Sequence, residues 1–166
     1  MGHHEHHKHD KTAVVCAIIT VSDTRTEASD DSGRTIREQL EEHGHRVEFY
    51  QILADEPALI TTAIHSMAIN VEAIVINGGT GLAHRDTTYE AVSRLLDKEI
   101  RGFGELFRQL SYEQIGPAAM LSRATAGVVG NRVIFSIPGS TKAVQLAMTK
   151  LIVPQLAHIV GLIRGE

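Results

Sequence analysis

Two runs of almost wholly apolar residues, 13–21 and 73–76, constrain the fold of this chain more than any other feature. A strand with one face in water alternates apolar and polar residues, whereas a strand buried on both faces carries a nearly continuous apolar run. Strands of the second kind belong to parallel sheets that helices cover on both sides. The two runs therefore predict a three-layer α/β fold, with a mostly parallel central sheet and helices on both faces.

The other segments continue this alternation of strand and helix. Residues 46–53, 124–128 and 132–137 are predicted to be further strands. Apolar residues at helical spacing predict helices around Ile36 and Leu40, at residues 59–67, 88–96, 103–110 and 117–121, and from about 140 to 160. There is no internal repeat and no linker, so we expect one domain over residues 12–166.

The composition is that of an ordinary globular protein, with 43% hydrophobic and 22% charged residues. The net charge of −4 provides no overall basic field, which argues against a nucleic-acid partner. The sequence shows no apolar signal region, and we expect no stretch of it to be long and apolar enough to span a bilayer. These features predict a cytoplasmic protein without a nucleic-acid or membrane partner.

Two features near the start of the chain carry no predicted function. Residues 1–11 hold half of the ten histidines and too little apolar surface to pack, so a disordered His-rich tail is expected. Cys16 is the single cysteine and lies inside the first apolar run. We interpret it as a buried, inert thiol rather than a catalytic one.

Polar residues follow each predicted parallel strand at the point where the strand ends. Ser22 and Asp23 follow the first strand, Asp55 the second, a glycine-rich turn at 78–81 the third, and residues 138–140 the last. Ligands of doubly wound sheets bind outside the carboxyl ends of the strands. We therefore expect these residues to share one ligand-binding site.

The glycine-rich turn consists of Gly78, Gly79, Thr80 and Gly81. Glycines accept positive φ and bring bare backbone N–H groups close to a ligand, so such a turn can bind an anion. The alternative is a tight turn between a strand and a helix, with no ligand. The turn matches neither the dinucleotide-binding fingerprint nor the P-loop, because the Gly-Lys-Ser/Thr ending is missing.

Asp55 and Asp86 each precede a predicted helix, and two interpretations of them stay open. The first is that each carboxylate caps its helix, which is the commonest role of an Asp in this position. The second is that both hold a magnesium ion at one edge of the sheet. Magnesium commonly takes one or two carboxylates together with phosphate oxygens and waters.

Hydroxyl and cationic side chains elsewhere offer further contacts to an anion. Ser122 is followed by Arg123, and Ser140 is followed two residues later by Lys142. Ser140 stands where a helix N-cap is expected. A lysine in the first turn opposes the helix dipole, so Lys142 either contacts a phosphate or is a solvated side chain.

Seven motifs occur in an order that resembles the MogA/MoaB family of molybdenum cofactor biosynthesis proteins. They are TVSD (20–23), DSG (31–33), DE (55–56), NGGTG (77–81), RDTTYEA (85–91), LSRATAG (121–127) and IPGSTKA (137–143). The segment at 102–116 resembles the MoaB branch most closely. The resemblance implies a molybdopterin-binding α/β fold and the transfer of AMP from Mg-ATP to the terminal phosphate of molybdopterin, with release of pyrophosphate.

The resemblance also implies roles for individual residues. Asp55 and Asp86 match the two aspartates that the family uses for catalysis, and with them a magnesium site. The phosphate- and pterin-binding loops of the family match Gly78, Gly79, Thr80, Gly81, Gly139 and Ser140, with Ser22, Asp23, Ser122 and Lys142 as weaker matches. A homo-oligomer, trimer or hexamer, is implied as well. The alternative is a non-catalytic molybdopterin-binding or carrier protein of the same pathway.

Overall fold

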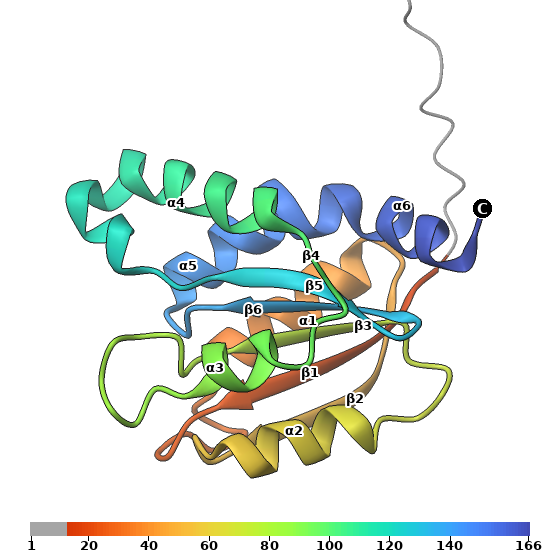
Figure 1. Ribbon diagram of the computed structural model, residues 1–166, viewed down its shortest axis with the longest axis horizontal. Coiled ribbons are helices and arrows are strands. Elements are labelled where there is room, and N and C mark those ends of the chain that lie inside the picture. Colours follow the sequence, from red (N-terminus) through yellow and green to blue (C-terminus); the bar gives the residue numbers. More distant parts are fainter. Residues whose placement is uncertain (1–12) are drawn as a thin grey trace, which may run out of the picture.

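A computed structural model describes residues 13–166 and arranges them around one six-stranded sheet (Figure 1). The predicted His-rich tail at 1–11 lies outside the described residues. The strands are β1 (Val15–Val21), β2 (Arg46–Leu53), β3 (Ala73–Asn77), β4 (Lys98–Glu99), β5 (Thr125–Val129) and β6 (Arg132–Ile137). Their order across the sheet is β2-β1-β3-β6-β5-β4.

The sheet is mostly parallel, as the apolar runs predict. β1 pairs in parallel with β2 and β3, and β3 pairs in parallel with β6. β5 runs antiparallel to β6 and to β4. Every residue of β1 and of β3 is buried, because both strands lie inside the sheet and both of its faces are covered.

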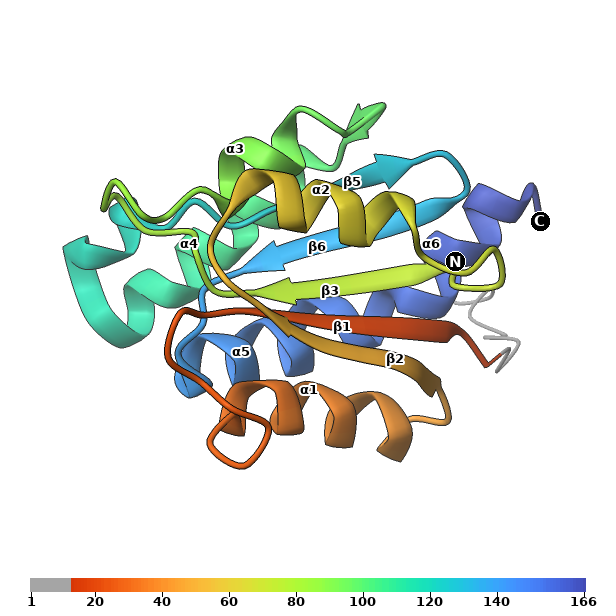
Figure 2. The same ribbon diagram turned by 90° about the horizontal axis from the view of Figure 1, so that it is seen from below.

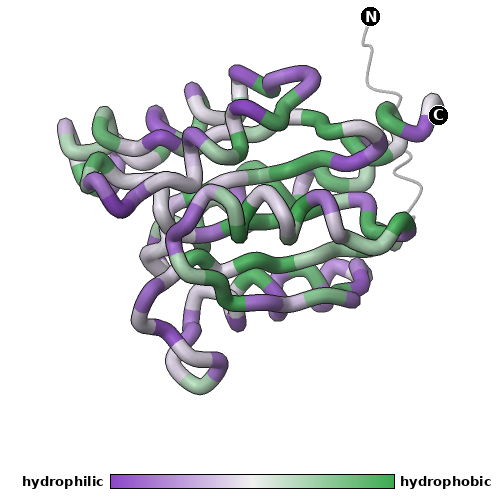
Figure 3. The backbone as a smooth tube through the Cα atoms, turned by 60° about the horizontal axis from the view of Figure 1, so that its bottom comes forward, coloured by the Kyte–Doolittle hydropathy of each residue, from purple (hydrophilic) through white to green (hydrophobic). Residues whose placement is uncertain are grey.

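Helices cover the two faces of the sheet, which confirms the three-layer fold (Figure 2). On one face Cys16 and Ile18 of β1 pack with α1 (Asp31–Glu42), α4 (Arg101–Ile115), α5 (Thr141–Ala147) and α6 (Val153–Arg164). On the other face Ala17 and Ile19 pack with α2 (Pro57–His65) and α3 (Thr88–Ser93). Figure 3 shows the hydrophobic stretches along the strands and many hydrophilic ones in the loops and outer helices.

The parallel strands place one crevice at their carboxyl ends. β1 lies between β2 and β3, so the chain leaves β1 toward one neighbour and returns to the other. The loop after β1 leads to α1 on one face, and the loop after β3 leads to α3 on the opposite face. Loops that diverge in this way leave room for a ligand between them.

Two elements differ from the sequence-based expectations. The strand β4 is only two residues long and was not predicted, since so short a strand has no periodicity. The final helix extends over Thr141–Arg164 and contains one π-helical stretch, Met148–Ile152. That stretch ends two residues before Pro154, whose ring and missing N–H disturb the hydrogen bonds of the preceding turn.

The final helix also contradicts the expectation that no stretch is long and apolar enough to span a bilayer. The helix Thr141–Arg164 has 24 residues and a mean hydropathy of 1.6, so it meets that criterion by length and composition. Its apolar residues have another explanation, because Val144, Met148 and Leu156 are fully buried in the core against the sheet.

Candidate functional site

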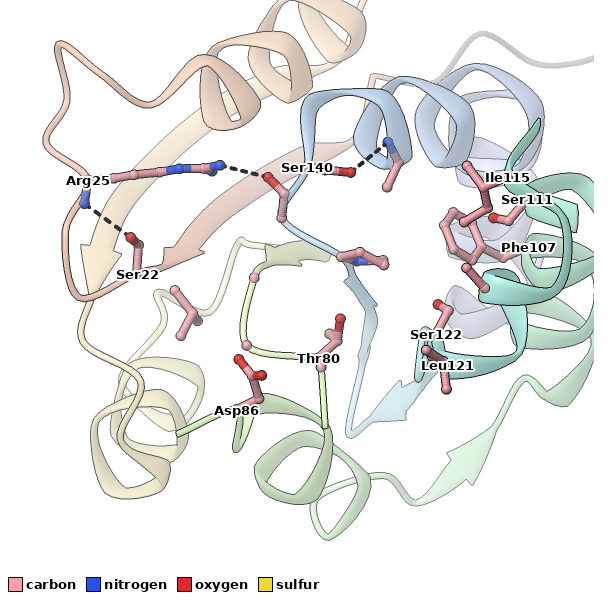
Figure 4. A pocket seen from close by; sticks show the side chains of 18 of the residues that line it. Ser22, Arg25, Thr80, Asp86, Phe107, Ser111, Ile115, Leu121, Ser122 and Ser140 are labelled. Atoms are coloured by element: carbon pink, nitrogen blue, oxygen red, sulfur yellow. Dashed lines mark hydrogen bonds between the residues drawn. The ribbon is translucent and has the colours of Figure 1, made fainter. Parts of the chain in front are cut away.

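A cavity of about 580 Å³ opens at the carboxyl ends of β1, β3 and β6 (Figure 4). Its polar side is formed by the loops that follow these three strands. Its apolar side is formed by α4 and by the 3-10 helix Gly116–Leu121, from which Phe107, Ile115 and Leu121 line the cavity. The cavity therefore presents polar groups on one side and an apolar wall on the other.

Most of the predicted site residues line this cavity. They are Ser22, Gly78, Gly79, Thr80, Gly81, Asp86, Ser122, Gly139 and Ser140. Three predicted residues, Asp23, Asp55 and Lys142, are not among the lining residues.

The glycine-rich turn has the positive φ angles that its sequence predicts. φ is +99° at Gly78 and +67° at Gly79. A Cβ at Gly78 would overlap the carbonyl oxygen of Val21, and a Cβ at Gly79 would overlap Thr88 and Asp55. The turn needs glycine for its own close packing as well as for any ligand.

The carboxylates of Asp55 and Asp86 flank this turn from two sides. A Cβ on Gly79 would meet Asp55 Oδ2, and a Cβ on Gly81 would lie 2.6 Å from Asp86 Oδ2. Asp86 lines the cavity, and its Oδ2 accepts a hydrogen bond from the backbone N–H of Ala83 at 3.2 Å. Asp55 is buried behind the turn, with 7% of its surface exposed.

The structure does not bear out the capping interpretation for either aspartate. The N-cap of α2 is Glu56 and the N-cap of α3 is Thr87, and neither helix has a side-chain cap hydrogen bond. Asp55 Oδ1 instead accepts hydrogen bonds from the backbone N–H and the hydroxyl of Thr87. Within residues 13–166 no group of three or more His, Cys, Asp or Glu side chains could hold a metal ion.

Asp23 connects two of the loops rather than lining the cavity. Its Oδ1 accepts a hydrogen bond from the backbone N–H of Asp55 at 3.1 Å, and its Oδ2 pairs with the guanidinium of Arg85 at 2.6 Å. The hydrogen bond from Arg85 is the main reason why the pKa of Asp23 lies below its ordinary value. Asp23 thus holds the backbone of Asp55 and the side chain of Arg85, the residue before Asp86.

Arg123 organises the glycine-rich turn and does not line the cavity, so its guanidinium serves the protein's own acceptors rather than the anion that the sequence suggested. Its guanidinium donates to the carbonyl oxygens of Thr80 at 3.0 Å, Gly81 at 2.6 Å and Asp86 at 3.1 Å. It also pairs with Glu90 and lies over the ring of Tyr89.

The predicted serines keep hydroxyl hydrogens that a ligand can use. Ser140 caps α5, because its Oγ accepts from the backbone N–H of Ala143 at 3.2 Å. Ser22 Oγ accepts from the N–H groups of Thr24 and Arg25. Since each hydroxyl acts as an acceptor here, its own hydrogen remains free to donate. Lys142 is exposed to solvent and is not among the residues that line the cavity, which favours the solvated alternative.

Sequence reasoning missed two parts of the site. Arg25 lines the cavity, and its guanidinium donates to the carbonyl oxygen of Gly139 at 2.9 Å. The apolar wall, with Phe107 and Ile115, comes from a helix that was predicted without any role. The only signal for the wall was helical periodicity, which cannot distinguish a helix face that packs on the core from one that borders a cavity.

These features of the cavity define a class of ligand-binding protein. An apolar wall facing backbone turns, hydroxyls, one carboxylate and one guanidinium is suited to a small ligand that has both an apolar and an anionic part. The site lies where doubly wound α/β proteins bind such ligands.

Comparison with known proteins identifies the family. The model of the family described as "Probable molybdopterin binding domain" matches residues 17–158. Molybdenum cofactor biosynthesis protein B from Bacillus cereus is 53% identical over 158 residues, which cover 93% of this chain and 94% of that protein.

Two solved structures agree with this result. A crystal structure of a molybdenum cofactor biosynthesis protein B has a TM-score of 0.91 and 51% identity, and covers 94% of this chain and 99% of that one. The tungsten cofactor synthesizing protein MoaB from Pyrococcus furiosus has a TM-score of 0.82 and 37% identity, and covers 92% and 98%. The chain belongs to the molybdopterin-binding family of molybdenum cofactor biosynthesis proteins.

Proposed function

We propose that this chain, as one domain over residues 12–166, is a molybdopterin adenylyltransferase. It binds molybdopterin in the cavity and transfers AMP from Mg-ATP to the terminal phosphate, with release of pyrophosphate. The observation that carries the proposal is the placement of Asp55 and Asp86 on two sides of the glycine-rich turn, with neither carboxylate capping a helix. Two carboxylates beside a glycine-rich turn that can bind an anion suit the transfer of a nucleotidyl group.

In the proposed reaction, an oxygen of the terminal phosphate attacks the α-phosphorus of ATP. The bond between the α-phosphorus and the oxygen that bridges to the β-phosphate breaks, and pyrophosphate leaves. The reaction needs no protein nucleophile, so the residues act by orientation and charge. The serine hydroxyls and the backbone N–H groups of Gly79, Thr80 and Gly81 would orient the phosphates, whereas the N–H of Gly78 already donates to Ile137. The apolar wall would exclude water from the ligand.

The carboxylates would hold a magnesium ion together with substrate oxygens. Asp55 Oδ1 is occupied by Thr87, and Asp86 Oδ2 by Ala83, so each carboxylate has its other oxygen left for an ion. Two carboxylate oxygens do not fill a magnesium shell, and phosphate oxygens and waters would supply the rest. Bound there, magnesium would neutralise charge on the phosphates.

A non-catalytic molybdopterin-binding or carrier protein is the second candidate, and one observation favours it. Neither Lys142 nor Arg123 offers its charge to the cavity, so Arg25 is the one cationic side chain among the described lining residues. A triphosphate carries more charge than one guanidinium neutralises. The two candidates differ in turnover, which is measured as pyrophosphate release from Mg-ATP at saturating molybdopterin. Release at a steady rate supports the transferase, and tight molybdopterin binding without release supports the carrier.

We also propose that the chain forms a homo-oligomer, a trimer or a hexamer, in the cytoplasm, without a nucleic-acid or membrane partner. Large apolar side chains that lie outside the cavity and would be covered in an assembly are exposed on α4 and the 3-10 helix after it: Leu106, Tyr112 and Met120. Light scattering coupled to size-exclusion chromatography measures the assembly, and a monomeric mass would contradict it.

A further inference from the structure

Arg25 is the cationic side chain on the polar side of the cavity, and two hydrogen bonds hold its guanidinium in place. One nitrogen donates to the carbonyl oxygen of Gly139 at 2.9 Å, and the other pairs with Asp30 Oδ1 at 3.4 Å. A guanidinium has five N–H groups, and these contacts use two of them. No residue in 13–166 accepts from the others, and 31% of the side chain is exposed. Figure 4 shows Arg25 across the cavity from Phe107 and Ile115.

Asp30 is the buried end of this arrangement. Its side chain has no exposed surface, and its Oδ2 accepts hydrogen bonds from the hydroxyls of Thr20 and Tyr50, each at 2.6 Å. Its Oδ1 accepts from the backbone N–H of Gly33 at 3.0 Å. These donors belong to β1, β2 and α1, so the carboxylate is fixed by three elements of the core.

The negative charge of Asp30 is largely taken up by these donors. Burial tends to raise the pKa of its carboxyl, but the hydrogen bonds from Thr20, Tyr50 and Gly33 and the charge of Arg25 outweigh burial, so the pKa lies below its ordinary value. Because four donors share this one buried carboxylate, it competes only weakly with an anion in the cavity for the guanidinium of Arg25. The outer edge of the Arg25 guanidinium therefore remains an attractive partner for such an anion.

We propose that Arg25 forms a phosphoryl-binding subsite at the polar edge of the cavity and that Asp30 is the positioning residue that holds its guanidinium there. The planar fork of a guanidinium matches two oxygens of one phosphate group. Ser22 lines the same cavity, and its Oγ accepts from the backbone N–H of Arg25 at 3.1 Å, which leaves its hydroxyl hydrogen free to donate. The subsite rests on the proposed function only for the identity of its ligand, which is the terminal phosphate of molybdopterin or the triphosphate of ATP.

Calorimetric titration with pyrophosphate, Mg-ATP, adenosine and molybdopterin tests the subsite. Arg25→Gln should weaken pyrophosphate binding about tenfold, since a hydrogen bond to a charged group contributes about 1.5 kcal/mol, and Arg25→Lys should recover part of the loss. The matched control is Arg46→Gln, which removes an exposed charge at the start of β2. The phosphate source is whichever of Mg-ATP and molybdopterin loses affinity, while adenosine should bind as before. Unchanged affinity of Arg25→Gln for pyrophosphate, Mg-ATP and molybdopterin would overturn the subsite.

The role of Asp30 is tested by a double-mutant cycle. Asp30→Asn keeps an oxygen for Gly33 and loses the charge that holds Arg25, so it should weaken pyrophosphate binding. In the double variant with Arg25→Gln, Asp30→Asn should cause almost no further loss of pyrophosphate affinity. Losses that add independently in the double variant would overturn the positioning role. If Asp30→Asn does not fold, Tyr50→Phe removes one anchor, and the same cycle with that variant decides the question.

The subsite and the transferase can fail separately. Arg25-dependent pyrophosphate binding in a protein that never releases pyrophosphate from Mg-ATP would keep the subsite and overturn the transferase. Steady release of pyrophosphate from Mg-ATP, together with affinities for pyrophosphate, Mg-ATP and molybdopterin that do not depend on Arg25, would keep the transferase and overturn the subsite.

Discussion

Asp55 and Thr87 lie 32 residues apart in the sequence and are joined by two hydrogen bonds. Asp55 Oδ1 accepts from the backbone N–H of Thr87 at 3.1 Å and from its hydroxyl at 2.7 Å. These two hydrogen bonds attach Thr87, the residue after Asp86, to the loop that follows β2. Because Asp55 is buried and Asp86 borders the cavity, the two aspartates should respond differently to the same substitution.

Asp86→Asn should lower AMP transfer about a hundredfold and leave the free energy of unfolding nearly unchanged. The amide keeps an oxygen for the N–H of Ala83, while the lost charge removes an oriented contact to the transferring group, which costs on the order of 3 kcal/mol. Pyrophosphate release and thermal unfolding measure the two effects. Asp31→Asn, on the exposed surface of α1, is the matched control. A folded Asp86→Asn protein that works at the parent rate would contradict the role of this carboxylate.

Asp55→Asn should reduce both activity and stability. A neutral amide holds the two donors of Thr87 less strongly than a buried carboxylate does, and we expect a loss of about 1–3 kcal/mol in the free energy of unfolding. Urea denaturation measures it. If both aspartates act on one ion, the double variant should lose less activity than the sum of the single losses. Stability equal to that of the parent would show that the contact with Thr87 is not an anchor.

Alanine substitutions at Gly79 and at Gly81 should have different effects, one mainly on the stability of the fold and the other mainly on AMP transfer. Gly79→Ala places a side chain at positive φ against Asp55 and Thr88, so it should destabilise the fold by about 1–3 kcal/mol. Gly81 has no positive φ, and its new methyl would only displace the end of the Asp86 side chain. Gly81→Ala should therefore melt near the parent temperature but lose AMP transfer, as Asp86→Asn does. Equal melting temperatures for both alanine variants would contradict this separation.

Cys16 should not react with thiol reagents in the folded protein. The thiol has no exposed surface, and burial, with a smaller effect of Glu72, raises its pKa to about 12. The reactive thiolate is therefore nearly absent at pH 8. Absorbance with a disulfide reagent should show no reaction until denaturant is added. Fast labelling without denaturant would mean that β1 opens readily.

The protein should lose stability in acid partly through Asp30. Its pKa in the folded protein lies below the ordinary value of 3.8, so the carboxylate contributes stability that is complete above that value and is lost as the pH falls through the folded pKa. Asp30→Asn should flatten this part of the stability curve below about pH 4. Unfolding in urea at a series of pH values measures the slope. Parallel curves for parent and variant would show that Asp30 does not respond in this way.

The sheet could be predicted well from the sequence because β1 and β3 consist almost wholly of apolar residues, which indicates burial on both faces. The sequence also predicted that the loops after β1, β3 and β6 lie together, since the carboxyl ends of parallel strands lie at the same edge of a sheet. The partners of Arg25, Asp23 and Arg123 could not be predicted in this way, because the partners of a charged side chain are decided by how distant segments come together in the fold. Arg25 binds a carbonyl 114 residues away, and Arg123 contacts the glycine-rich turn more than forty residues before it. No local pattern distinguishes such residues from solvated charges.

The π-helical stretch in the final helix sets the rotational phase of the segment that begins at Ser140. Buried apolar residues recur at every fourth position, at Val144, Met148, Ile152, Leu156 and Val160. In a regular α-helix each step of four residues advances about 40° around the axis, so four steps would carry the last of them nearly half a turn away from the first. The wider turn at Met148–Ile152 takes up one extra residue, about 100° of rotation, and keeps these side chains facing the sheet. Deleting one residue within this turn would leave the composition almost unchanged, yet it would rotate the cap at Ser140 relative to the anchored half of the helix.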